Sequence, residues 1–443
     1  MNEAVSLVQP VPNSFEEHWM PFTANRDFKR DPRLIVRSEG VYLWDQSGGR
    51  IIDGSSALFN VAAGHGRRQI ADAVHAQMLA NDYAPLFQTG HPGPFAVASK
   101  LAAILPEPIN HVFFTNSGSE SVDTALKIAM AYHRARGESQ RLRFVSRERA
   151  YHGVNMGGTS LAGIVRNREG FPVTLPGVVH MRHTWDPNVR FQRGQPEGGA
   201  ELADDLQRMC DTYGAGTIAA VFVEPVAGST GTLVPPKGYL ERIREICDQN
   251  GILLVFDEVI TGFGRLGTPF AAQAFGVTPD IMTMAKALTN GSIPMGAVAV
   301  KDEIYDTVMD ASPDAAIEFF HGYTYSGHPA ACAAALATLA IYEEEQLFKR
   351  AAELSDYFLD QVWSLEGLPA VVDLRGYGLM AGVEVASDGV PGRRGGALQK
   401  ALFWSGLHVK FTGDTAILAP PLVSERAHID EIIDKLRTAI ERL

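Results

Sequence analysis

The sequence predicts an α/β protein in which helices cover a mainly parallel sheet, with a smaller α+β domain beside it. Three observations lead to this prediction. From about Gly64 to about Ala340, short β-rich runs alternate with longer amphipathic stretches, the order that builds βαβ units. Runs such as AAVFV and ILLVF are apolar throughout, as expected of strands with helices on both sheet faces. After about Tyr342 this alternation ends, so a region of different construction is expected.

Within the alternating region, the order of strands and helices can be assigned. Gly251 follows one amphipathic stretch and precedes an apolar run, which is a common end for a helix. The runs expected to form strands are His111–Thr115, Arg143–Ser146, Ile218–Glu224 and Ile252–Val259. The stretches expected to form helices are Ser119–Arg136, Tyr239–Asn250 and Pro329–Glu343.

The smaller domain is expected to combine both ends of the chain. A helical segment, EEEQLFKRAAELSDYFLDQVWSL, leads to VVDLRGYGLMAGVEV, which alternates like a half-exposed antiparallel strand. A final helix is expected over Ala427–Leu443, and VYLWD near the start resembles an edge strand. We therefore expect residues 1–63 to complete the small domain, 64–340 to form the large domain and 341–443 to return to the small one.

Composition limits the cellular setting and the partners. The net charge of -12 argues against a nucleic acid or an anionic membrane as the main partner. The longest apolar run, Pro329–Tyr342, is too short to cross a bilayer, and MNEAVSLVQPVPNSF does not read as a signal peptide. The scattered Cys210, Cys247 and Cys332 argue against a disulfide framework and a zinc site, and they fit a reducing compartment. A cytoplasmic protein is expected.

The first motif with chemical meaning is FFTNSGSESVDTALKIA, residues 113–129. A strand runs into Asn116-Ser117-Gly118-Ser119 and a helix follows at once, so backbone N–H groups and the positive helix end point at an anion such as phosphate. Ser117 and Ser119 add hydroxyl groups, and Gly118 allows close approach. The alternative is that Ser119 only caps the helix. The lysine of a P-loop is missing.

The second motif is ILLVFDEVITGFGRLG, residues 252–267. An acid at the carboxyl end of a buried strand requires a partner. In a strand, Asp257 and Val259 face one side and Glu258 the other. A carboxylate beside a flat apolar contact suits a pyridinium ring. The alternatives are a Mg²⁺ ligand or an ion pair with a helix, but a metal needs further oxygen ligands and no second acidic cluster is found.

The third motif is PDIMTMAKALTNGSIPMGAV, residues 279–298, in which Lys286 is surrounded by apolar or neutral residues. Such surroundings disfavour the charged form, so the pKa of the amine falls and the amine becomes nucleophilic. A lysine that forms a Schiff base needs this environment. The alternative is a lysine whose stem packs against the core while its ammonium group reaches water.

Together these motifs resemble the fold-type-I, class-III aminotransferases. The resemblance rests on DEVITGFGRLG, PDIMTMAKALTNGSIPMGAV and HGYTYSGHPAACAAAL, and it extends from HWMPFTANRDFKRDPRLIV to GDTAILAPPLV. It is strongest to the branch that uses ω-amino acids or amines with pyruvate, which includes β-alanine:pyruvate aminotransferase. The resemblance implies pyridoxal 5′-phosphate as cofactor, a ping-pong reaction, and a homodimer with shared active sites or a tetramer of such dimers.

The resemblance also implies individual roles. Lys286 holds the cofactor covalently and moves the substrate proton, while Asp257 keeps the pyridine nitrogen protonated. Thr324 is matched to a phosphate contact made in the neighbouring subunit. The remaining positions matched to cofactor contacts are Ser117, Gly118 and Ser119 at the phosphate, Tyr151 stacked on the ring with His152 next to it, Glu224 close to the cofactor, and Val259 against the ring.

The substrate pocket departs from the family in two places. Phe22, Phe59 and Phe87 fall where this branch builds its pocket, but many relatives have tryptophan at the position of Phe59, so a roomier pocket is expected. Core packing is the alternative for each phenylalanine. Just before the GDT turn this chain has Lys410 in place of an arginine that grips carboxylates. Either Lys410 replaces it with a looser grip, which we favour, or Lys410 faces solvent.

Two other functions share the same fold. An aminomutase or a decarboxylase would need the same Lys286 and Asp257, so the fold alone does not decide. EPVAGSTGTLVPP and GHPAACAAAL resemble the transaminases instead. A non-catalytic binding protein would be expected to have lost Lys286, Asp257 or the phosphate-binding serines, and all of them are intact.

Overall fold

The computed structural model describes residues 14–172 and 174–443. Most of the N-terminal stretch MNEAVSLVQPVPNSF, which is not expected to be a signal peptide, lies outside these described residues. Of the helices within them, not one has both the length and the hydrophobicity needed to cross a membrane.

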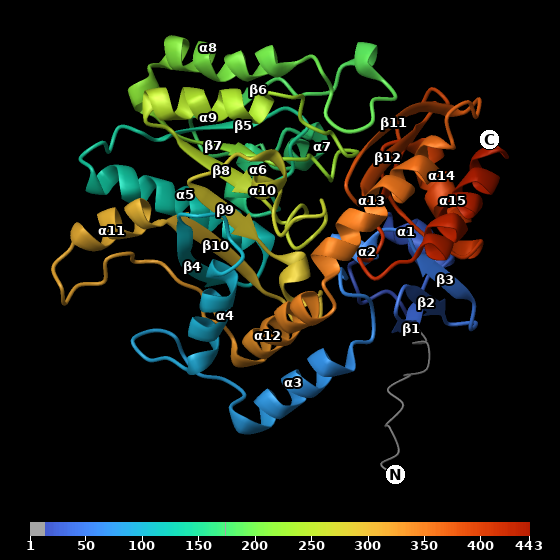
Figure 1. The fold of residues 1–443 in the computed structure, drawn as a ribbon, viewed down its shortest axis with the longest axis horizontal. Helices are drawn as coiled ribbons and strands as arrows, with labels where there is room; N and C mark the ends of the chain where they lie inside the picture. The colour runs from blue at the N-terminus through green and yellow to red at the C-terminus, as the bar shows by residue number, and fades with distance from the viewer. Residues whose placement is uncertain (1–13, 173) are drawn as a thin grey trace.

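A seven-stranded sheet forms the centre of the described structure (Figure 1). β10 runs antiparallel to both of its neighbours, and the other pairings are parallel. The sheet is therefore mainly parallel, as predicted. Its strands, in spatial order, are β4 (Ile109–Thr115), β10 (Gly296–Lys301), β9 (Ile281–Met284), β8 (Leu253–Asp257), β7 (Ile218–Val223), β5 (Arg143–Arg147) and β6 (Val178–Met181).

Helices cover both faces of this sheet, which explains the uninterrupted apolar strands. On β8, Leu254 and Phe256 pack in the cluster that contains α9 (Tyr239–Asn250). Leu253 and Val255 pack in a separate cluster with α5 (Gly118–Ala135). Because alternate residues of a strand face opposite sides, Asp257 at the end of β8 projects toward the α5 side.

Smaller sheets lie at one end of the molecule, where the N-terminal and C-terminal segments meet (Figure 1). One has the order β1 (Ile35–Glu39), β2 (Tyr42–Asp45), β3 (Arg50–Asp53) and β13 (Leu407–His408). The other is antiparallel, with the order β11 (Val371–Tyr377), β12 (Met380–Val385), β15 (Thr415–Leu418) and β14 (Lys410–Thr412). Pairing of β3 with β13 shows that both ends of the chain build this region, as predicted.

The expected helices are present with small changes at their ends. The longer ones include α12 (Pro329–Glu344), α13 (Leu347–Trp363), α14 (Arg393–Trp404) and α15 (Arg426–Ile440). The others are α1 (Asn25–Arg30), α2 (Ser56–Phe59), α3 (Arg68–Ala80), α4 (Pro92–Ala102), α6 (Met156–Leu161), α7 (Val165–Glu169), α8 (Asp204–Tyr213), α10 (Ala271–Phe275) and α11 (Asp302–Asp310), with 3₁₀ turns at Pro187–Val189, Ala200–Ala203, Ala215–Thr217 and Lys286–Thr289.

Two predictions for the small region were wrong. VVDLRGYGLMAGVEV is not one half-exposed strand but the hairpin β11–β12, which turns at Gly378 with φ +61°. Its strands are mostly buried because both faces are covered: Val383 packs in the main core, and Met380 packs in another cluster with Phe59. VYLWD is not at an edge, since β2 lies between β1 and β3.

Candidate active site

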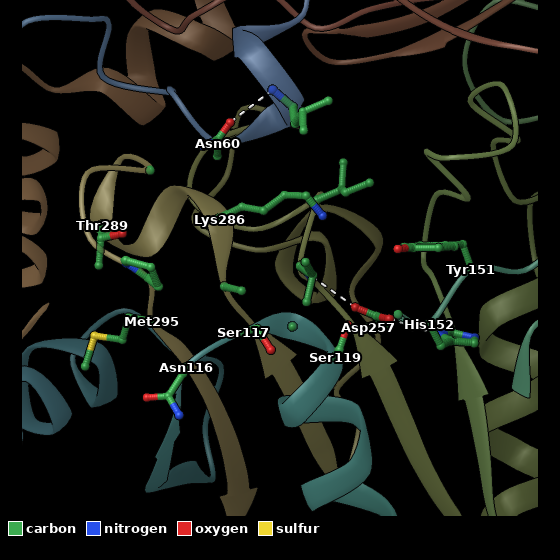
Figure 2. Close-up of a pocket in the computed structure, with 18 of the residues that line it drawn as sticks. Asn60, Asn116, Ser117, Ser119, Tyr151, His152, Asp257, Lys286, Thr289 and Met295 are labelled. Atoms are coloured by element: carbon green, nitrogen blue, oxygen red, sulfur yellow. Dashed lines mark hydrogen bonds and ion pairs between the residues drawn. The ribbon is translucent and has the colours of Figure 1, made fainter. Parts of the chain in front are cut away.

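A cavity of about 380 Å³ opens at the carboxyl ends of the parallel strands (Figure 2). This edge is where α/β sheets place their ligands, because the loops that leave the strands converge there. The residues that line it are Leu58, Asn60, Asn116, Ser117, Gly118, Ser119, Tyr151, His152, Gly153, Glu224, Val226, Asp257, Val259, Ile260, Ala285, Lys286, Thr289, Gly291, Ile293, Pro294 and Met295.

The N-terminus of α5 forms one side of this cavity. The helix begins at Gly118, and Ser117 is its N-cap, with its Oγ accepting a hydrogen bond from the Glu120 N–H at 3.2 Å. The alternative in which Ser119 caps the helix is therefore wrong, and the Ser119 Oγ instead accepts a hydrogen bond from the Val154 N–H at 3.1 Å. The first N–H groups of a helix have no intrahelical partner, so this end offers donors to an anion.

Two glycines allow the backbone to come close at this end. A Cβ at Gly118 would lie 3.0 Å from the methyl groups of Val259. A Cβ at Gly153, whose φ is +96°, would lie 2.5 Å from the Ser119 Oγ. The loop after β5 and the start of α5 are thus closely packed, and both glycines line the cavity.

Asp257 stands at the carboxyl end of β8 and is held by three hydrogen bonds. Its Oδ2 pairs with the His152 Nδ1 at 2.8 Å, and its Oδ1 accepts from the Thr283 Oγ1 at 3.1 Å and from the Val259 N–H at 3.2 Å. Asp257 and His152 are both buried. The partner that a buried acid requires is therefore His152, which the sequence motif did not reveal.

The strand ends earlier than predicted, at Asp257 instead of Val259. Glu258 nevertheless projects away from the cavity, and its carboxylate accepts hydrogen bonds from the Ala271 and Ala272 N–H groups at 2.9 and 2.8 Å. Val259 follows the strand, lines the cavity and lies over Gly118. Asp257 and Val259 thus both face the cavity even though Val259 lies in a loop.

Lys286 begins a 3₁₀ turn directly after β9 and projects into the cavity (Figure 2). Its backbone has φ +46°, an uncommon conformation for a residue with a side chain. Burial lowers the pKa of its amine, while the carboxylates of Asp257 and Glu224 act in the opposite direction. A lowered pKa makes the neutral, nucleophilic form of the amine more available.

Glu224 and Tyr151 complete the polar wall opposite Lys286. The Tyr151 N–H donates to the Glu224 Oε1 at 3.0 Å. Burial raises the pKa of Glu224 to about 7; His152 opposes this rise and Asp257 adds to it. Burial and the same two carboxylates, Asp257 and Glu224, also raise the pKa of the Tyr151 hydroxyl. The cavity therefore holds a carboxyl group that carries a proton part of the time near neutral pH.

Several residues assigned to the site from the sequence do not line this cavity within one chain. Phe22 and Phe87 are 77% and 61% exposed, and Thr324 is also exposed. Phe59 is buried in a cluster with Val226 and Ile260, which themselves line the cavity. Phe59 therefore lies behind the wall of the cavity.

Lys410 lies at the start of β14 and is also outside the cavity lining. Its backbone N–H donates to the Ser55 Oγ at 2.9 Å. Its side chain is half-buried, and burial lowers the pKa of its ammonium group. No ion pair of its ammonium group is found among the described residues. A partly desolvated cation of this kind is available to an anion.

Comparison with known proteins identifies the family. The model described as Aminotransferase class-III matches residues 23–440. The omega-aminotransferase of Caulobacter vibrioides is 53% identical, over 97% of this chain and 98% of its own. The beta-alanine–pyruvate aminotransferase of Pseudomonas aeruginosa is 47% identical over 99% of both chains. A crystal structure of an (S)-enantioselective omega-transaminase from Thermomicrobium roseum has a TM-score of 0.90 and is 41% identical, with 96% of each chain covered.

The chain belongs to the class-III aminotransferases. It is therefore a fold-type-I enzyme that depends on pyridoxal 5′-phosphate. The matches support transamination and not the aminomutase, decarboxylase or non-catalytic alternatives.

The cavity fits this cofactor. α5 begins at Gly118, which lines the cavity, so the first N–H groups of this helix are placed to donate to a phosphate. Asp257 offers a fixed carboxylate to the nitrogen of a pyridine ring, and Lys286 offers an amine of lowered pKa. Donors for an anion, an acceptor for a ring N–H and a nucleophile thus line the same cavity.

The sequence motifs did not indicate several residues that line the cavity. Leu58 and Asn60 come from the segment after β3, and Thr289 and Met295 come from the segment after Lys286. The TNGSIPM run, rich in turn-forming residues, marked a loop directly after the lysine and could have suggested the second group. Nothing local marks Leu58 or Asn60, because the tertiary fold brings them to the cavity.

Proposed function

We propose that this aminotransferase moves the amino group of an ω-amino acid such as β-alanine, or of a primary amine, to pyruvate by a ping-pong reaction. The observation that carries the proposal is the set of Lys286, Asp257 and Glu224 around one cavity. Full-length similarity to enzymes named omega-aminotransferase and beta-alanine–pyruvate aminotransferase supports the choice of substrates.

In this proposal, the cofactor is held at three points. The α5 end, with Ser117, Gly118 and Ser119, would receive the phosphate. Tyr151 and Val259 would contact the ring, and Asp257 would pair with its nitrogen. His152 holds Asp257 in place. When bound, pyridoxal phosphate supplies an electron sink that stabilises negative charge on the substrate carbon. Asp257 supports that role because its carboxylate favours a protonated ring nitrogen.

Lys286 Nζ binds the cofactor and, in its free form, moves a proton on and off the substrate carbon. The lowered pKa suits both tasks, since only the neutral amine acts as nucleophile or base. Glu224, with a pKa of about 7, can hold a proton beside Tyr151 at working pH. The buried position of Asp257 and Glu224 keeps water from competing for these protons.

We assign the grip on the substrate carboxylate to Lys410, assisted by a pocket to which Phe22, Phe59 and Phe87 contribute. The support for Lys410 is a half-buried ammonium group with a pKa lowered by burial, which gains from a carboxylate partner. Lysine provides a point charge without the planar fork of arginine, so this grip tolerates substrates of varied shape but holds pyruvate loosely.

We propose further that the working enzyme is a homodimer with shared active sites, or a tetramer of such dimers. Phe87 lies against Gly322, since a Cβ there would lie 2.9 Å from its ring. The Tyr83 hydroxyl donates to the carbonyl oxygen of Thr324 at 3.0 Å. Phe87 and Thr324 thus belong to one exposed surface, suited to entering the site of a partner.

The domain boundaries and the cellular location are also proposals. Residues 1–63 and 341–443 are assigned to the small domain and 64–340 to the large one. A cytoplasmic location is supported by Cys210, Cys247 and Cys332, which are buried and free in the described part of the chain.

Initial-rate kinetics test the proposed reaction. With β-alanine and pyruvate varied together, a ping-pong reaction gives parallel double-reciprocal lines and forms alanine in step with the loss of pyruvate. Intersecting lines, or no alanine, would count against it.

Sedimentation of the purified enzyme then distinguishes a dimer from a monomer, and a monomer with full activity would contradict the shared site.

A further inference from the structure

A strained turn joins β3 to the wall of the cavity. We refer to residues 55–60 as the wall turn. Ser56, Ala57 and Phe59 have φ values of +46°, +56° and +66°, and Ala57 combines its φ with ψ −97°. Residues with side chains avoid this region. Such strain persists only where surrounding contacts enforce it, and it is found preferentially at functional sites.

The wall turn borders the cavity directly. Leu58 and Asn60 both line it, and the Asn60 Oδ1 accepts a hydrogen bond from the Leu58 N–H at 3.0 Å (Figure 2). On its other side the turn lies against the segment that follows Lys286. A Cβ at Gly291 would lie only 2.1 Å from the Asn60 Nδ2. The wall turn therefore lines the same cavity as Lys286 and packs against the segment that follows it.

Asp53 enforces the strained conformation from inside the protein. It is fully buried, and its Oδ1 accepts the Ser55 N–H at 3.0 Å while its Oδ2 accepts the Ala57 N–H at 2.7 Å. The His65 Nε2 lies 2.8 Å from the same Oδ2. The carbonyl oxygen of Ala57 lies 3.1 Å from the His408 Nε2. Side chains thus bind both polar backbone groups of the most strained residue.

The same turn is bonded to the strands that carry Lys410. The Ser55 Oγ donates to the Ile417 carbonyl oxygen at 2.7 Å and accepts the Lys410 N–H at 2.9 Å. The Ser56 Oγ donates to the Ala419 carbonyl oxygen at 2.7 Å. A shift of the wall turn would therefore also shift the start of β14.

We propose that Asp53 is a positioning residue for substrate selection. It holds the wall turn in its strained form and so sets the distances from Lys286 to Leu58, Asn60 and Lys410. Asp53 does not line the cavity and acts only through the turn. This inference rests on the proposed function. In this inference, the wall turn discriminates between a small amine that carries a carboxylate and a bulkier aromatic amine.

Asp53→Asn is the direct test, because an amide has one oxygen where the turn needs two acceptors. We expect the ratio of kcat/KM for β-alanine to that for benzylamine to change by about tenfold or more, the size of a one-methylene misfit in a pocket. Cofactor content and the visible spectrum stay unchanged, since the α5 end and Asp257 are untouched. Loss of both activities by the same factor would overturn the inference.

A second pair of variants covers the case in which Asp53→Asn does not fold. His408→Leu removes the hydrogen bond to Ala57, whereas His408→Gln keeps an N–H donor in its place. We expect His408→Leu to change the substrate ratio from its wild-type value and His408→Gln to keep the wild-type ratio. Equal ratios in the two His408 variants would contradict the proposal.

Asp45 provides a matched control. It is also a buried carboxylate, and its Oδ1 accepts the Ser47 and Gly49 N–H groups at 2.8 and 2.9 Å in the β2–β3 turn. Asp45→Asn is expected to lower stability but not to change the substrate ratio. Should it move the ratio as far as Asp53→Asn does, the effect would be a general loss of stability.

Hydrogen–deuterium exchange separates this inference from the proposed function. In Asp53→Asn holoenzyme, faster exchange is expected in the peptides that contain residues 54–60 and 408–412, with the α5 peptides unchanged. Wild-type enzyme that converts neither amine would refute the proposed function, but the exchange measurement would still decide on the turn. Unchanged exchange at 54–60 would overturn the role of Asp53.

Discussion

The Oδ2 of Asp257 and the Nδ1 of His152 lie 2.8 Å apart in the protein interior. An ionised carboxylate only accepts hydrogen bonds, so we infer that the proton of His152 is on Nδ1. The Nε2 of the same ring is buried and has no partner among the described residues. His152 therefore fixes the orientation of the carboxylate and leaves its oxygens as acceptors for a pyridine N–H.

Asp257→Asn tests this arrangement. An amide cannot stabilise the protonated ring nitrogen, so we expect kcat to fall by roughly a hundredfold or more while the cofactor stays bound. The measurement is kcat per bound cofactor. Asp280→Asn is the control, because Asp280 is a buried acid directly before β9 that pairs with Arg244 and Lys301. Equal losses in both variants would mean that the charge of Asp257 has no special role.

Glu224→Gln tests the raised pKa of the Glu224 carboxyl group. The pKa of Glu224 is raised from 4.5 to about 7, so the folded protein retains a proton that the unfolded chain loses in this range. The free energy of unfolding of the cofactor-free protein therefore falls as pH rises from 4.5 to 7, by up to about 3 kcal/mol for this group. We expect Glu224→Gln to remove this part of the pH dependence.

The free energy of unfolding is measured with urea at several pH values for wild type and Glu224→Gln. The difference between the two proteins isolates the effect of Glu224 from that of Glu258. Burial also raises the pKa of Glu258 to about 7, and it is present in both proteins. Glu366→Gln, a change at an exposed position, serves as control. Parallel pH profiles for wild type and Glu224→Gln would contradict the raised pKa.

Lys410→Arg tests the proposed grip on carboxylates. The guanidinium group binds a carboxylate through two parallel hydrogen bonds, so the KM for pyruvate should fall by roughly fivefold or more. Lys400→Arg is the control, since the ammonium group of Lys400 is already paired with Asp31 at 3.0 Å, whereas that of Lys410 has no ion pair among the described residues. An unchanged KM for pyruvate in Lys410→Arg would remove Lys410 from the substrate site.

Thr324→Ala tests the shared active site. If Thr324 contacts the phosphate in the partner subunit, loss of one hydrogen bond of about 1 kcal/mol raises the Kd for pyridoxal phosphate by roughly fivefold. Thr438→Ala, which removes a hydroxyl bonded to Asp434 on α15, should leave the Kd unchanged. Equal Kd values for wild type and Thr324→Ala would contradict the assignment.

The parts of the fold that were predicted correctly are those whose signal is local. β7 was predicted from an apolar run, which reflects burial on both of its faces. α9 was predicted from an amphipathic stretch that ends at a glycine, which reflects burial on one face. The β11–β12 hairpin was missed because alternation continues across its tight turn at Gly378. β2 was placed at an edge because nothing in VYLWD reveals how many neighbours a strand has.

The residues of the site also fall into those that a local pattern indicates and those that only the assembled fold brings together. Lys286 and Asp257 were singled out by local pattern, an amine in an apolar run and an acid after a buried strand, and the family resemblance then suggested their roles. The bond between Asp257 and His152 joins residues 105 positions apart, and the one between Ser55 and Ile417 joins residues 362 apart. Contacts of this range depend on the assembled fold, so no local pattern indicates them.

The visible spectrum of the purified enzyme tests the central claim, that Lys286 holds pyridoxal phosphate for transamination, most directly. We predict a yellow band that bleaches with β-alanine and returns with pyruvate, and that is absent in Lys286→Ala. A band that ignores β-alanine but bleaches with benzylamine would move the substrate to simple amines and leave the lysine in its role. No yellow band after addition of the cofactor, or the same band in Lys286→Ala, would contradict the claim.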